Sequence, residues 1–204
     1  MSALSIHKQI EKRIRLLKRG SIIVPDDFSE MGGTEVVKKV LLRLEKQGFL
    51  KRVAFGIYVY PKQSKLLGTL TPSVEEIAKA IAKRDKARIV PTGLYALNRL
   101  GLSTQIVLNA IYLTDGAARK IRVDGRSILF KKAAPKNLAA MGEISGLVIQ
   151  ALKAIGKDKV EPHEKKRVLE LLKKEKHKNI QHDIALAPAW IRNIMRQAIT
   201  HKVK

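Results

Sequence analysis

Basic side chains recur at helical spacing over residues 34–47, where Thr34 is expected to cap a helix and Gly48 to end it. One face of this helix is apolar and consists of Val37, Val40, Leu41 and Leu44. The opposite face carries Glu35, Lys39, Leu42 and Lys46, with Lys38 and Arg43 on its flanks. Lysine and arginine bind phosphates and base edges, and leucine can contact a thymine methyl group. The pattern is therefore that of a DNA contact surface, although a solvated helix face shares part of it.

The residues predicted to contact DNA come from this helix and from the basic hairpin that follows it. They are Thr34, Lys38, Lys39, Leu42, Arg43, Lys46, Lys51 and Arg52.

The other titratable groups do not combine into a nucleophile, a base and an orienting group. The carboxylate pairs at 26–27 and 75–76 open predicted helices, where capping explains them, and Asp115 and Asp124 precede turn glycines. The five histidines form neither an i, i+4 pair nor a His-Glu-x-x-His motif, and the chain has no cysteine. We therefore expect no enzyme activity, no catalytic residue, no metal site and no cofactor.

The charge balance of the chain points to a polyanionic partner. Its 204 residues include 41 Lys and Arg against 18 Asp and Glu, for a formal net charge of +23. The excess is +7 over residues 1–62 and +16 over the remainder, so it belongs to a folded surface and not to a tail. Clustered cations gain affinity by releasing counterions from phosphates. Without an apolar run long enough to span a bilayer or a signal peptide, we expect a cytoplasmic protein with no membrane partner.

The elements that would position the basic helix follow an order known from DNA-binding modules. Residues 5–20 predict an amphipathic helix, 21–24 a short strand and 26–31 a short helix ended by two glycines. After the basic helix, 49–53 and 57–60 predict a hairpin. This is the order of a winged helix-turn-helix, in which the helix after the turn enters the major groove and the wing touches the backbone. We assign it to residues 1–62.

The remainder of the chain predicts a second domain of mixed α+β structure. Residues 63–71 lack periodicity and are assigned as a linker, followed by an α+β effector domain over 72–204. Two helices, near 72–82 and 91–101, precede three strands, at 106–113, 119–123 and 127–132, whose Asp-Gly turns predict a small antiparallel meander. Helices are expected at 142–155, 162–178 and 180–199, the last docked through Trp190, Ile191, Ile194 and Met195. The predicted fold class is thus α+β.

Several ordered stretches of the chain resemble the AbiEi-like antitoxins and transcriptional regulators of type IV toxin–antitoxin systems. The resemblance covers nearly the full length and rests on residues 19–20, 25–28, 41–44, 51–53, 56–61, 101–105, 112–116, 145–152 and 187–191.

The resemblance implies a protein with two activities. The winged helix would bind inverted repeats in double-stranded operator DNA and repress its own operon, and the C-terminal domain would oppose a nucleotidyltransferase-like toxin, with or without direct contact. Two positions depart from similar proteins, which often have arginine before Gly56 and Ser-Arg at the start of the basic helix. This chain has Phe55 and Gly33-Thr34 there, so its operator preference is expected to differ.

The C-terminal domain has its own candidate basic surface, on the predicted helix 162–178. The residues are Lys165, Lys166, Arg167, Lys173 and Lys174. One interpretation of this surface is a solvated face without a partner. Two functional interpretations stand beside it. It could act against the toxin, or it could bind structured RNA such as tRNA and shield it. The low aromatic content, 4%, argues against stacking on single-stranded bases but not against binding duplex RNA by shape.

Overall fold

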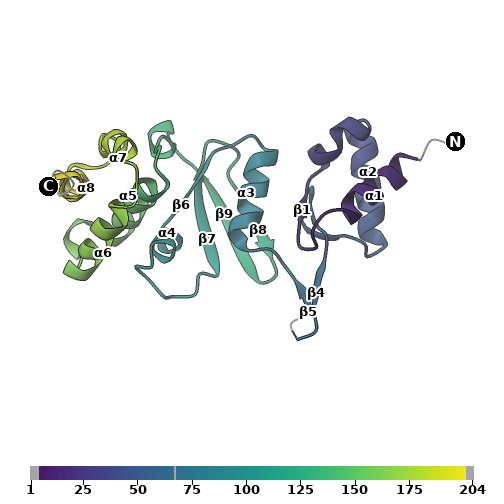
Figure 1. Ribbon diagram of the computed structural model, residues 1–204, viewed down its shortest axis with the longest axis horizontal. Coiled ribbons are helices and arrows are strands. Elements are labelled where there is room, and N and C mark those ends of the chain that lie inside the picture. The colour runs from purple at the N-terminus through teal and green to yellow at the C-terminus, as the bar shows by residue number, and fades with distance from the viewer. Residues whose placement is uncertain (1–4, 67, 201–204) are drawn as a thin grey trace. The chain divides into compact units, whose positions relative to one another are not determined.

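The computed structural model describes residues 5–66 and 68–200 (Figure 1). Helices alternate with small sheets, so the predicted α+β class is confirmed. Contacts divide the chain into two compact units: unit 1 is Met1–Lys86 with Ile121–Arg126, and unit 2 is Ala87–Lys120 with Ser127–Lys204. In the described part of the chain, every helix is too short or too polar to cross a membrane.

Unit 1 begins with the elements expected over residues 1–62. They are α1 (Ile6–Arg15), β1 (Ile22–Ile23), the 3-10 segment η1 (Pro25–Met31), α2 (Thr34–Lys46), β2 (Lys51–Ala54) and β3 (Ile57–Val59). The strands form one antiparallel sheet in the order β1-β3-β2, with Ile22 opposite Val59 and Arg52 opposite Tyr58. Thr34 is the first helical residue and not the cap, since Gly33 occupies that position.

The core of unit 1 lies between α1, η1, α2 and the sheet. The predicted apolar stripe of α2 is confirmed, because Val37, Val40, Leu41 and Leu44 are all buried. Ile10 and Ile14 of α1 pack in the same cluster with Phe28 of η1. This packing turns the opposite face of α2 outward.

The segment assigned as a linker is an ordered hairpin. Strands β4 (Lys62–Ser64) and β5 (Gly68–Leu70) pair antiparallel, and α3 (Val74–Arg84) follows. Ser73 caps α3 together with Glu76 in a capping box, as the sequence pattern of that segment favours. The hairpin lacks an apolar face, since its residues are exposed or half-buried, so its sequence gives no strand periodicity.

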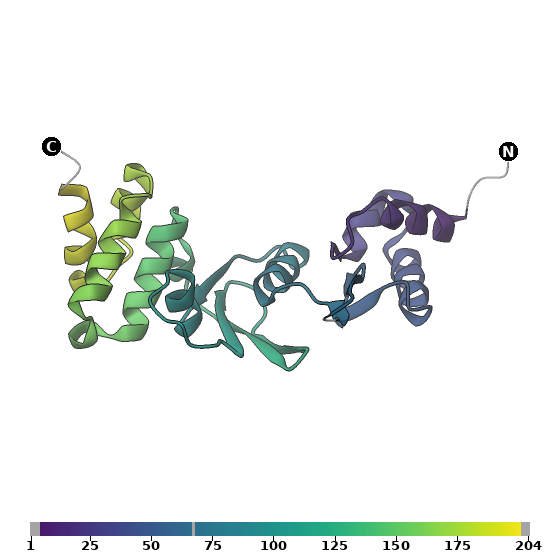
Figure 2. The ribbon, with the colours of Figure 1, turned by 60° about the horizontal axis from the view of Figure 1, so that its bottom comes forward.

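Unit 2 combines strands with a bundle of helices, green to yellow in Figure 2. The elements outside the bundle are β6 (Ile89–Thr92), α4 (Leu94–Arg99), β7 (Asn109–Thr114), β9 (Arg126–Lys132) and the 3-10 segment η2 (Pro135–Leu138). Strand β8 (Arg119–Val123) begins in unit 2, and its residues from Ile121 onward count with unit 1. The bundle contains α5 (Glu143–Ile155), a 3-10 turn η3 (Lys157–Lys159), α6 (Pro162–Leu172), α7 (His177–Ile184) and α8 (Ala189–Thr200). The predicted docking seam of the last helix is confirmed, with Ile191 and Met195 buried and Trp190 packed against them.

The three-stranded antiparallel meander predicted for this unit is wrong. The sheet is four-stranded and mixed, in the order β6-β7-β9-β8, and β7 pairs with β9 in parallel. Asp124 and Gly125 both adopt positive φ, at 44° and 75°, and close the β8–β9 turn as expected. Asp115 instead accepts hydrogen bonds from the backbone N–H and the side chain of Arg88. The turn after it joins β7 and β8, which are not neighbours in the sheet. Strand β6 pairs with β7 from the sheet edge, where its Pro91 is tolerated.

The predicted helices 162–178 and 180–199 are also corrected, because the chain breaks at 173–176 and again before α8. Glu175 at the first break is buried and accepts hydrogen bonds from Ile144 N, Lys176 N and the Asn179 side chain. Asp183 of α7 is fully buried and accepts from Met141 N, Gly142 N and the Ser145 hydroxyl. Both carboxylates thus satisfy free N–H groups around the start of α5.

Candidate nucleic-acid interface

The outward face of α2 carries all of the helix residues predicted to contact DNA. Thr34, Lys38, Lys39, Leu42, Arg43 and Lys46 are exposed. Leu42, at 37% exposure, and Val36, at 44%, add apolar area among these cations. In the described part of the chain, no carboxylate lies within ion-pair distance of Lys39, Arg43 or Lys46. These three cations are therefore available to an external anion.

Lys38 differs from its neighbours because it is already paired. Its Nζ lies 2.8 Å from Oε1 of Glu35, one turn earlier on α2. The hydrogen bond from Lys38, together with the charge of that lysine, lowers the pKa of Glu35. The pair places one negative charge at the start of α2, and Lys38 offers less net charge to a phosphate than its position on the helix suggests.

The two hairpin cations lie in different environments. Lys51 Nζ is 3.2 Å from Asp124 Oδ2 and 3.4 Å from Thr71 Oγ1, all within unit 1. The hydrogen bond from Thr71, with a smaller contribution from Lys51, lowers the pKa of Asp124. Arg52 has no carboxylate partner among the described residues, and its guanidinium lies 5.2 Å from the centroid of the Phe55 ring.

The tip of the hairpin carries an exposed aromatic ring, and a hydrogen bond fixes its backbone. Phe55 is 82% exposed and precedes Gly56, whose φ of 65° makes the tight turn. The guanidinium of Arg84 donates to the Phe55 carbonyl oxygen, which connects the tip to α3. Arg52 and Phe55 therefore project together from a fixed turn.

A second group of cations in unit 1 surrounds a hollow that the sequence pattern does not predict. Lys18, Arg19 and Lys62 line a space of about 370 Å³ with the hydroxyl-bearing residues Ser21 and Thr71, and we call it the Arg19 hollow. Arg19 also borders an adjoining space of about 400 Å³. The only sequence signal was the basic pair before Gly20, because Lys62 approaches that pair only in the folded chain.

The candidate basic surface of unit 2 is divided by the break after α6. Lys165, Lys166 and Lys173 border one hollow of about 440 Å³, which we call the α6–α8 hollow. Its other walls are Pro162, Leu169, Glu170, Gln197 and Ala198. Arg167 points elsewhere, because a Cβ at Gly101 would lie 3.6 Å from its Nη2 atom. Lys174 lies in the turn after α6. The predicted single helical face of five cations is therefore wrong, and three of the five share a surface.

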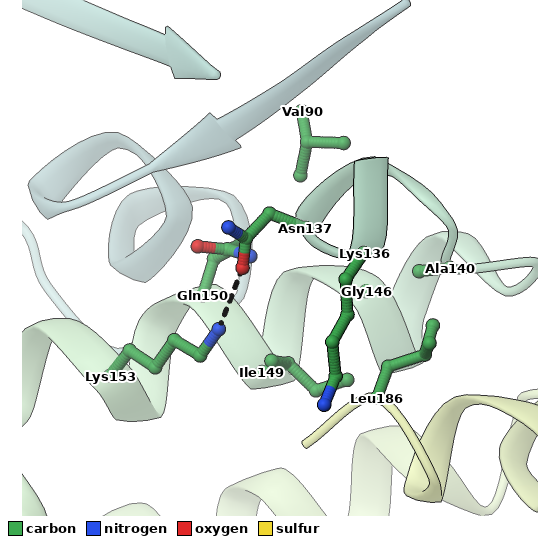
Figure 3. Close-up of a pocket in the computed structure, with 9 residues that line it drawn as sticks. All are labelled: Val90, Lys136, Asn137, Ala140, Gly146, Ile149, Gln150, Lys153 and Leu186. Carbon is green, nitrogen blue, oxygen red and sulfur yellow. Dashed lines mark hydrogen bonds between the residues drawn. The ribbon is translucent and has the colours of Figure 1, made fainter. Parts of the chain in front are cut away.

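The small cavity of unit 2 has little room for a substrate. It measures about 10 Å³, roughly the space of one water molecule, and is lined by residues including Asn137, Gln150 and Lys153 (Figure 3). Lys153 donates to Asn137 Oδ1 over 3.1 Å, and its burial, with the nearby charge of Lys136, lowers its pKa. Among the described residues, no group of three or more His, Asp or Glu side chains could hold a metal ion.

Comparison with known proteins gives a family but no activity. No curated protein matches the chain. The family model described as "Family of unknown function (DUF6088)" matches residues 9–180, from within α1 to within α7. Because this match spans most of the 204 residues, the chain belongs to the DUF6088 family.

Proposed function

We propose that this protein is a DNA-binding antitoxin that represses its own operon, as its resemblance to AbiEi-like regulators implies. Residues 1–62 would act as a winged helix-turn-helix, with α2 in the major groove and the β2–β3 hairpin as the wing. The C-terminal domain would oppose a nucleotidyltransferase-like toxin. A protein acting on operator DNA in this way would work in the cytoplasm.

The observation that carries the DNA-binding part is the outward face of α2. Lys39, Arg43 and Lys46 succeed one another at spacings of four and three residues, so they lie on one side of the helix. None of them has a carboxylate partner in the described residues, and a buried apolar stripe holds the helix in place beneath them. A helix of 13 residues with such a face suits a major groove that admits one α-helix.

The strand arrangement supports the same proposal. In the order β1-β3-β2, the strand that precedes η1 pairs with the second strand of the hairpin, so the hairpin extends from the sheet beside α2. Its tip offers Arg52 and Phe55. A wing that approaches the minor groove can use both, because arginine favours the negative potential there and apolar side chains can enter between base steps.

A gel shift of the full-length protein tests this proposal. Binding is compared for the DNA upstream of its gene, unrelated DNA of equal length, and tRNA. Selective retardation of the upstream DNA, lost in Lys39→Ala/Arg43→Ala, supports the winged helix. Stronger binding of tRNA than of either DNA, unaffected by those substitutions, would replace the proposal with RNA shielding.

The antitoxin part needs a cellular test. The proposal expects a nucleotidyltransferase gene next to the gene of this protein. Such a gene is expressed with and without this protein, and growth is measured. Rescue by the full chain but not by residues 1–62 alone supports a separate role of the C-terminal domain. Rescue by residues 1–62 alone would leave repression as the main activity.

A further inference from the structure

The Arg19 hollow lies on unit 1, and none of the residues assigned above to DNA contact lines it, although Lys51 lies 3.4 Å from Thr71 at its edge. Its walls come from the turn after α1, the start of β4, the end of β5 and the first turn of α3 with the residues before it. Lys18, Arg19 and Lys62 are exposed, and no described carboxylate lies within ion-pair distance of them. Three unneutralised cations around one hollow create a positive potential that a single surface lysine does not.

Arg19 is held in a defined orientation. Its guanidinium lies 4.7 Å from the centroid of the Tyr60 ring, and Nη1 donates to the carbonyl oxygen of Pro61 over 3.1 Å. The backbone beneath it is also fixed, because Gly20 N donates to Tyr60 O and Tyr60 N donates to Ser21 O. A guanidinium has five N–H donors, so most remain free for an incoming oxygen. An oriented fork of this kind suits a phosphate group.

The single acidic residue at the hollow is already engaged. Glu76 accepts hydrogen bonds from the backbone N–H and the hydroxyl of Ser73 in the capping box of α3. The bond from the Ser73 hydroxyl is the main reason why the pKa of Glu76 is lowered, so the carboxylate stays ionised. The hollow still has a surplus of positive charge, with three cations against one carboxylate.

The aromatic rings near the hollow are covered, which decides between two kinds of nucleic acid. Tyr60 is 5% exposed beneath Arg19. Phe49 is half-buried, and the guanidinium of Arg15 lies over it at 4.8 Å from the ring centroid. Binding of single-stranded nucleic acid relies on stacking of bases on open rings. We therefore expect the hollow to contact the phosphates of a duplex and not its bases.

We propose that the Arg19 hollow is a second phosphate-binding site, which contacts the DNA backbone outside the stretch contacted by α2 and the hairpin. The identity of the ligand as duplex DNA rests on the proposed function, whereas the site itself rests on the cation geometry. Such a contact adds affinity equally for all sequences and makes binding more sensitive to salt.

The experiment measures the affinity of the full-length protein for the upstream duplex and for a scrambled duplex over a series of salt concentrations. The test variant is Lys18→Gln/Lys62→Gln, and the matched control is Lys12→Gln/Lys65→Gln, which removes two exposed lysines outside the hollow. Each phosphate contact contributes about 0.9 to the slope of log affinity against log salt, so the slope should fall by about 2 in the test variant. The control should change it much less, and the preference for the upstream duplex should stay constant in both.

Three results would overturn the site. A slope equal to that of the control would show that the hollow does not contact DNA. A loss of tRNA binding with unchanged DNA binding would make it an RNA site. Binding of inorganic phosphate to the wild type but not to the test variant, with no effect on the affinity for DNA at constant ionic strength, would make it a site for a free anion.

Two further variants separate this site from the proposed function and from simple misfolding. Lys39→Ala/Arg43→Ala should abolish the preference for the upstream duplex and leave the contribution of the hollow, so either proposal can fail alone. Arg19→Lys keeps the charge but loses the planar contact with Tyr60 and the defined fork. It should weaken binding of both duplexes several-fold, and wild-type affinity would show that the orientation of Arg19 plays no part.

Discussion

The outward face of α2 and the α6–α8 hollow are both basic, but they differ in what lies between the cations. On α2, Lys39, Arg43 and Lys46 follow one side of a single helix. At the hollow, Lys165, Lys166 and Lys173 border a space whose walls include the apolar side chains of Leu169 and Ala198. The first arrangement is linear and polar, and the second is a rim around apolar surface.

This difference indicates different partners for the two surfaces. A linear row of cations on a helix matches the regular phosphates and base edges of a groove. An apolar hollow with a charged rim resembles the arrangement of a protein interface, where apolar contact lies at the centre and polar groups surround it. High net charge alone therefore does not identify nucleic acid as the partner of every basic surface in this protein.

The largest effect is expected from Lys39→Ala/Arg43→Ala. If each side chain reads a base, each contributes about 1–3 kcal/mol, so specific affinity should fall by more than about 30-fold. The measurement is a titration with the upstream duplex. The matched variant Lys165→Ala/Lys166→Ala in unit 2 should bind this duplex like the wild type, and an equal loss there would remove the distinction between the two surfaces.

Asp183→Ala should disrupt the α6–α8 hollow and leave the outward face of α2 intact. The carboxylate is fully buried and accepts from two backbone N–H groups and a hydroxyl at the start of α5, so its loss leaves buried donors without partners. With a cost of about 1–3 kcal/mol for each of the three unsatisfied donors, the free energy of unfolding of unit 2 should fall by at least about 3 kcal/mol. Thermal unfolding followed by Trp190 fluorescence measures this. Loss of DNA binding at a temperature where only unit 2 has unfolded would show that α2 depends on the bundle.

The sequence predicted those parts of both regions that depend on neighbours along the chain. The apolar stripe of α2 could be predicted because residues three and four apart share a helix face. Asp124-Gly125 could be assigned as a turn because the positive φ values it needs suit these residue types.

Contacts between distant residues explain what the sequence could not show. Asp115-Gly116 gives the same local signal as Asp124-Gly125, yet Arg88 engages Asp115 from 27 residues away. The break after α6 depends on Glu175, which accepts from a backbone N–H at Ile144, 31 residues away. The Arg19 hollow likewise needs Pro61, 42 residues from Arg19. A pattern within one segment contains no information about these partners.

The two hairpin cations should differ in their effect on DNA binding. Arg52→Ala should lower the salt slope by about 1, because this arginine has no carboxylate partner among the described residues. Lys51→Ala should lower it less, because Asp124 already neutralises Lys51. The slopes are measured with the same duplex. Equal slopes for the two variants would mean that DNA displaces Asp124 from Lys51.

The smallest expected effect is on how the free energy of unfolding depends on acidic pH. It contrasts one carboxylate from each unit. Burial alone would raise the pKa of Glu175, but its hydrogen bonds from Lys176, Asn179 and Ile144 together lower it. A carboxylate with a lowered folded-state pKa contributes stability above its unfolded pKa and loses it as the pH falls through the folded pKa. Unit 2 should therefore lose stability on acidification, and Glu175→Gln should flatten this dependence.

The pKa of Glu35 is also lowered, by Lys38, but its carboxylate is exposed, so Glu35→Gln should leave the acid dependence of unfolding nearly unchanged. Unfolding followed over acidic pH for the three proteins tests this, and a flattened profile in Glu35→Gln instead would reverse the assignment.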